Sequence, residues 1–224
     1  MSTDSIRHPL TRALLILTLT TGVIDAACYL GLGRVFAANM TGNVVLLGFG
    51  IAGSSGLPVV APLVSLGAFL SGAVIGGRMG AALPPKEARL SRAMAIEIGL
   101  TALATLIAIV FDITPDHFSG DLIIALLAFA MGVRNATVRR LKVADLSTTV
   151  LTLTLTGLAA DSPLAGNDGE GSWRRGAAVA SMLVGAIAGA LLVKADLALV
   201  LLAAAVLALA TWLVFMPRAI TAAD

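Results

Sequence analysis

Charged side chains are scarce in this sequence. Only 12% of its 224 residues are Asp, Glu, Lys or Arg, whereas 58% are apolar. An ordinary soluble domain carries about 25% charged residues, because its surface must stay hydrated. The composition therefore excludes a soluble protein and predicts that lipid is the main solvent.

Cysteine and histidine are nearly absent. Cys28 is the single cysteine, and His8 and His117 are the two histidines. One thiol cannot form an intrachain disulfide, and these three side chains cannot build a cysteine–histidine metal site. The sequence also lacks the Gly-x-Ser-x-Gly, Walker and His-Glu-x-x-His motifs. We therefore expect no enzyme activity, no metal and no cofactor.

The positive charges lie in short clusters between apolar runs. The net charge is +2. This arrangement is typical of cytoplasmic loops in membrane proteins, and it argues against nucleic acid as a partner. The clusters are Arg7 with Arg12; Arg78, Lys86, Arg89 and Arg92; and Arg139, Arg140 and Lys142.

Six apolar runs are long enough to cross a bilayer core of about 30 Å as helices. They cover about 11–32, 58–80, 92–111, 121–138, 175–193 and 196–216. Two further stretches, about 36–53 and 146–160, contain too many Asn, Thr and Ser residues for helices that face lipid.

Whether the two polar stretches cross the membrane decides the topology. If each enters and leaves on the same side, the three basic clusters fall on the cytoplasmic side, as the positive-inside rule requires. If both cross, giving eight spans, the N-terminal arginines move outside. Six spans with two broken or re-entrant segments fit better. This topology places both termini in the cytoplasm.

The two halves of the chain resemble each other weakly. Residues 22–26 align with 132–136, which places Asp25 opposite Asn135, and about twenty residues later 39–44 align with 150–155. The order in each half is helix, polar stretch, helix, helix, with repeats at about 11–111 and 121–216. Three crossings per repeat make the second repeat inverted, an arrangement common among secondary transporters.

Small residues recur at every fourth position on the helix that follows each polar stretch. Gly72, Gly76 and Gly80 do so in the first half, and Ser181, Gly185 and Gly189 in the second. Such spacing lets helices pack closely. The glycine face of the first half could pack the repeats together or form a homodimer.

Two segments resemble a known family. The first runs from Gly22 to Gly48 and contains Asp25, the run Phe36-Ala-Ala-Asn-Met-Thr-Gly-Asn43 and Leu46-Leu-Gly48; the second comprises 132–136 and 148–156. They resemble the signatures of the YoaK family of bacterial inner-membrane proteins. Arg134 stands where that pattern usually has glutamine. The resemblance implies a bacterial cytoplasmic membrane and no established biochemical activity.

Asp25 and Arg134 lie within spans, where an ionised side chain costs about 2.5 to 3.5 kcal/mol and normally faces a cavity or a partner. Inverted symmetry would place both near the midplane, so they could pair. Asp25 could handle a proton or cation, with Arg134 as its counter-ion or an anion clamp. The alternative is a salt bridge that only fixes helix register. We expect Glu97, one turn inside its span, to reach the interface.

The polar stretches predict a binding site. Asn39 and Thr41 can cap a half-helix that starts near Thr41, Gly42 permits close approach, and Asn43 adds an amide. The second half-helix would start near Thr148 to Thr152. Two opposed helix N-termini suit a small anion or a carboxylate. The alternative is that these side chains only satisfy the broken backbone.

The sequence thus favours an all-α membrane protein that is a secondary transporter or permease for a small solute, with an anion and proton coupling as the expected chemistry. A non-transporting scaffold or accessory subunit, or a small channel, is the alternative. The expected partners are membrane lipid, the transported solute or ion, and a second copy of the chain.

Overall fold

The computed structural model describes residues 8–54, 56–82, 86–111, 113, 117–141 and 151–221. These residues form helices and no strand. Six long helices are α1 (Pro9–Gly31), α3 (Val60–Ala82), α4 (Lys86–Val110), α5 (Phe118–Leu141), α7 (Ser172–Val193) and α8 (Leu197–Thr221). Two short ones are α2 (Met40–Ile51) and α6 (Leu151–Ala160), and a single 3-10 turn, η1, covers Pro163–Ala165.

All six long helices are apolar enough to span a membrane. They match the six predicted runs, with ends that differ by a few residues. The largest difference is at α4, which begins at Lys86 rather than near residue 92. At about 1.5 Å per residue, the twelve residues of α2 extend only about 18 Å, which is too short for a full crossing. The fold is therefore that of an all-α, multi-pass membrane protein.

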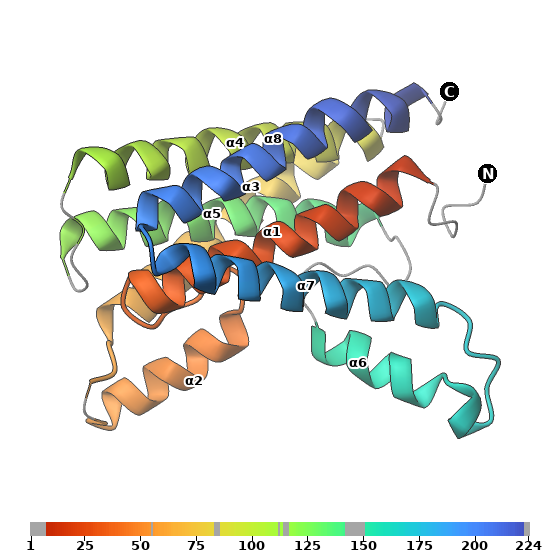
Figure 1. Cartoon of the computed structure of the whole chain (residues 1–224), viewed down its shortest axis with the longest axis horizontal. Helices are drawn as coiled ribbons and strands as arrows, with labels where there is room; N and C mark the ends of the chain where they lie inside the picture. The colour runs from red at the N-terminus through yellow and green to blue at the C-terminus, as the bar shows by residue number, and fades with distance from the viewer. Residues whose placement is uncertain are drawn as a thin grey trace.

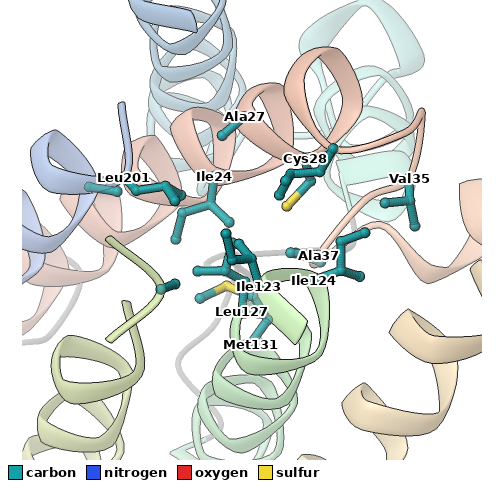
Figure 2. Packing of buried hydrophobic residues seen from close by; sticks show 14 of the residues in the cluster. Ile24, Ala27, Cys28, Val35, Ala37, Ile123, Ile124, Leu127, Met131 and Leu201 are labelled. Carbon is teal, nitrogen blue, oxygen red and sulfur yellow. The ribbon is translucent and has the colours of Figure 1, made fainter. Parts of the chain in front are cut away.

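Helices α1 and α5 form the centre of the bundle. Within the apolar stretch that could cross the membrane, 67% of α1 and 61% of α5 is buried inside the bundle, against 17–33% of the other four spans. Figure 2 shows Ile24 and Cys28 of α1 facing Ile123, Leu127 and Met131 of α5. The apolar side chains exposed on the outer helices are those that would meet lipid.

A turn after α1 returns the chain to this core. Gly33 and Arg34 have φ values of 110° and 58°, a conformation that reverses the chain after the helix. The extended segment that follows buries Val35 and Ala37 against α1 and α5 (Figure 2). It leads into α2 and places the backbone of Ala37 and Ala38 beside Asp25, in the C-terminal half of α1.

Helices α1 and α7 cross at backbone contact distance. A Cβ atom on Gly22 would overlap the carbonyl oxygen of Met182, and one on Gly185 would overlap that of Leu19. One turn further, a Cβ on Gly189 would lie 2.8 Å from the carbonyl oxygen of Val23. Only glycine permits this approach, which is how small residues let membrane helices pack.

Helices α3 and α5 cross in the same manner. A Cβ on Gly132 would overlap the carbonyl oxygen of Phe69, and one on Gly72 would overlap that of Phe129. A Cβ on Gly76 would lie 2.5 Å from the carbonyl oxygen of Val133. The predicted glycine face is thus occupied by α5 of the same chain, so Gly72 and Gly76 are not available to a second copy.

The short helices α2 and α6 lie on the same side of the bundle, and their first residues point toward its middle (Figure 1). Their last residues point outward, toward the beginnings of α3 and α7. The helix predicted to start near Thr41 does so, since α2 begins at Met40. This arrangement brings the first residues of α2 and α6 to one pocket.

Candidate functional site

The starts of α2 and α6 border a pocket of about 680 Å³. Helices α1, α3 and α7 and the segment before α2 supply the rest of its wall. Its polar lining residues are Thr21, Asp25, Tyr29, Asn39, Thr41 and Thr152, and Phe36, Phe69, Met182 and Leu151 are among the apolar ones. The pocket therefore brings together five of the predicted site residues: Asp25, Asn39, Thr41, Gly42 and Thr152.

Asp25 is the one ionisable carboxylate among the described lining residues. Its Oδ1 accepts hydrogen bonds from the backbone amides of Ala37 and Ala38, both at 2.9 Å. Its Oδ2 is buried and has no hydrogen-bond partner among the described residues. One oxygen thus anchors the segment before α2, while the other is free for a proton or a ligand.

Asn39 caps α2 as predicted. Its Oδ1 accepts a hydrogen bond from the amide of Gly42 at 3.2 Å. The close approach at Gly42 is made by the ring of Phe36, whose Cε2 atom would lie 2.9 Å from an added Cβ. Phe36 in turn stacks on Tyr29, with ring centroids 4.9 Å apart. The cap and the ring pair fix the shape of this wall.

Asn43 is fully buried behind the pocket and does not line it. Its Oδ1 accepts from the amide of Phe36 at 2.9 Å. Its Nδ2 donates to the carbonyl oxygen of Phe36 at 2.7 Å and to the hydroxyl of Ser65 at 3.0 Å. Asn43 therefore holds α2 to the extended segment and to α3, which is a structural role.

Glu97 does not reach the membrane interface, so that prediction is wrong. It is completely buried, and its Oε1 lies 2.7 Å from Nη1 of Arg134. Because α4 starts at Lys86, Glu97 lies eleven residues into the helix, about 16 Å along its axis rather than one turn. At that depth its charge requires a buried partner.

Arg134 forms its ion pair with Glu97, and no hydrogen bond joins it to Asp25 among those of the described residues. Its Nη2 donates to the hydroxyl oxygen of Thr21, one turn before Asp25 on α1. Arg134 still interacts electrostatically with Asp25. Because Thr21 lines the pocket, the Glu97–Arg134 pair lies directly behind the pocket wall.

The remaining predicted site residues differ in whether they line the pocket. Asn135, next to Arg134 on α5, is half-buried and does not line the pocket. Thr152 lines it from the first turn of α6. Thr148 lies outside the described residues. Within the part of the chain described, no group of three or more His, Cys, Asp and Glu side chains could hold a metal ion.

Comparison with known proteins agrees with these features. A family model described as "Protein of unknown function (DUF1275)" matches residues 13–214. The UPF0700 transmembrane protein YoaK of Bacillus subtilis (strain 168) is 35% identical over 150 residues. That alignment covers 65% of this chain and 64% of the relative, less than two thirds of its length. No solved structure matches. The chain therefore belongs to the DUF1275 family of unknown function, and the predicted resemblance to YoaK membrane proteins is confirmed.

Proposed function

We propose that this protein is a secondary transporter, or permease, for a small anionic solute in the cytoplasmic membrane of a bacterium. The observation that carries the proposal is the pocket at which two helices too short to span a membrane both begin, beside a carboxylate with a free oxygen. Helix N-termini attract anions through their exposed amides and dipoles. Transporters commonly bind their substrates between such interrupted segments.

An inverted repeat is the second part of the proposal, and the helix crossings support it. By the alignment of residues 22–26 with 132–136, Gly22 corresponds to Gly132, and the carbonyls that these two glycines contact make Met182 of α7 the counterpart of Phe69 of α3. Gly22 contacts the carbonyl of Met182, and Gly132 contacts the carbonyl of Phe69. The contact of Gly185 with Leu19 corresponds in the same way to the contact of Gly72 with Phe129. The contact of Gly189 with Val23 likewise corresponds to that of Gly76 with Val133.

The correspondence extends to the pocket. Phe69 and its counterpart Met182 both line it, and so do Thr41 and Thr152. A pseudo-twofold axis through the pocket would relate these pairs. Three spans in each half make the relation an inverted one, so that rocking of one half against the other would open the pocket to either side in turn.

Orientation follows from the charges and from the even number of spans. Helix α1 begins and α8 ends at the same end of the bundle (Figure 1). The basic clusters around Arg12, Arg78 and Arg139 would then share a side, which the positive-inside rule makes cytoplasmic. We propose that both termini lie in the cytoplasm.

Asp25 would couple the solute to a proton. An ionised carboxylate repels an anion, and the repulsion is strong in the low dielectric of a membrane protein. An anion can therefore share the pocket with Asp25 when Oδ2 carries a proton. Proton and anion would enter and leave together.

The test is uptake into proteoliposomes that contain the purified full chain. Labelled chloride, phosphate, acetate and lactate are offered with and without an inward proton gradient. We expect saturable uptake of at least one anion, stimulated by the gradient, and loss of that stimulation in Asp25→Asn. Asp196→Asn, at an exposed residue beside the start of α8, is the matched control and should transport normally.

Three results would contradict the proposal. Absence of uptake for every anion would favour a scaffold or accessory subunit. Non-saturating flux with conductance far above carrier turnover would favour a channel. Uptake that is equally active in Asp25→Asn and Thr152→Val would remove the pocket as the route of the solute.

A further inference from the structure

We infer that Asp25, Glu97 and Arg134 form one buried charge cluster that holds a single dissociable proton, and that Glu97 keeps this proton on Asp25 by occupying Arg134. Glu97 is thus a positioning residue for a proton site at the pocket. The inference deepens the proposed function by assigning the coupling proton, but its test involves no transport.

These three side chains are the strongly ionisable groups in the middle of the described bundle. Helices α2 and α6 contain no ionisable side chain, and those of α3, α7 and α8 lie near helix ends, at Arg78, Arg174, Arg175 and Arg218. Cys28 and Tyr29, weak acids on α1, are the other titratable neighbours of Asp25. The charge balance of the core therefore depends on two carboxylates and one guanidinium.

With both carboxylates ionised, the cluster would carry a net charge of −1 in a medium where an unpaired charge is costly. Arginine cannot supply neutrality by losing its proton, because its pKa is too high. A metal cation needs several oxygen ligands, whereas a proton needs a single oxygen, and Glu97 is completely buried. One bound proton makes the cluster neutral.

The geometry decides which carboxylate holds the proton. Arg134 makes a direct contact with Glu97 at 2.7 Å, so that Glu97 stays ionised. Asp25 has no direct bond to Arg134 and only two backbone amides on Oδ1. Oε2 of Glu97 also has no partner among the described residues, but Glu97 does not line the pocket, whereas Asp25 does. The O–H bond therefore forms at Oδ2 of Asp25, from a proton delivered through the pocket.

Removal of Glu97 would release Arg134. In Glu97→Gln the guanidinium retains a hydrogen-bond acceptor but has Asp25 as its remaining carboxylate in the cluster. Arg134 already contacts α1 close to Asp25, since its Nη2 donates to the hydroxyl oxygen of Thr21, one turn before Asp25. The pair is then neutral without a proton. Charge counting therefore predicts one dissociable proton in the native protein, none in Glu97→Gln, none in Asp25→Asn, and two in Arg134→Gln.

The proton is counted by infrared difference spectroscopy of the full chain in lipid bilayers, between about pH 5 and pH 9, where exposed carboxylates stay ionised. The carboxylic acid C=O band reports each buried group that gains a proton. We expect a one-group band in the native protein, in the conservative variant Glu97→Asp and in the control Asp196→Asn. The band should disappear in Glu97→Gln and in Asp25→Asn.

A native band that persists unchanged in Glu97→Gln or Asp25→Asn overturns the inference, as does the absence of a native band. Arg134→Gln should double the band. If that variant does not fold, the comparison of Glu97→Asp with Glu97→Gln still decides, because a purely structural role for Glu97 would not change the proton count. A native band that disappears in both neutral variants, together with proteoliposomes that take up no anion, would support the proton site and refute transport.

Discussion

Breaking the Glu97–Arg134 pair should destabilise the bundle more than replacing both partners. In Arg134→Met the buried carboxylate of Glu97 loses its counter-ion. In Glu97→Met the guanidinium loses its direct partner and keeps only Asp25, to which no hydrogen bond of the described residues joins it. Removing one partner of a buried pair costs about 3 to 5 kcal/mol, whereas well-packed apolar residues in place of both are nearly neutral. We therefore expect each single variant to lose about 3 to 5 kcal/mol and the double Met variant to lose less than either.

A native cysteine can report the free energy of unfolding. Cys28 is the single cysteine and is fully buried, so a maleimide dye reacts with it when the bundle opens. Unfolding by SDS in mixed micelles, followed by this reaction, gives the free energy of unfolding. Arg139→Met, at an exposed position on α5, the helix that carries Arg134, is the matched control and should change the free energy of unfolding by less than about 0.5 kcal/mol.

Additivity would refute the reasoning. If the double variant lost the sum of the two single losses, Glu97 and Arg134 would not be energetically coupled, and the buried ion pair would contribute nothing as a pair. The same conclusion would follow if Arg134→Met or Glu97→Met lost no more stability than the control Arg139→Met. Either result would also remove the basis for assigning the single proton of the charge cluster to Asp25.

Two further predictions use the same unfolding measurement. Gly185→Ala should destabilise the protein by about 1 to 3 kcal/mol, because the added methyl group would overlap the carbonyl oxygen of Leu19. The control Gly99→Ala should be neutral or slightly stabilising, because a Cβ there would meet nothing within 4 Å. Equal effects of the two variants would contradict the close crossing of α1 and α7. Asn43→Ala should lose about 1 to 3 kcal/mol, because the buried amide and carbonyl of Phe36 lose their side-chain partner, and an unchanged stability would contradict the structural role of Asn43.

Several features follow directly from local patterns. The six spans and the start of α2 at an Asn39 cap were predicted, because hydropathy and capping act within a few residues of the chain. The depth of Glu97 was missed, because the arginines at 89 and 92 made the span look shorter than α4 is. The one carboxylate in the apolar window that follows Arg92 was the available signal that Glu97 needed a partner.

The amino-acid sequence by itself determined that this chain is a membrane protein, how many of its helices can cross the membrane, and which few polar groups must be buried away from lipid. Only the tertiary structure decided how those groups are paired: Arg134 with Glu97, Asp25 with two backbone amides, and Asn43 with the chain before its own helix. Partner choice depends on helix rotation and on approach within a few ångströms, which glycine contacts between distant segments set. A hydropathy pattern contains no record of those distances.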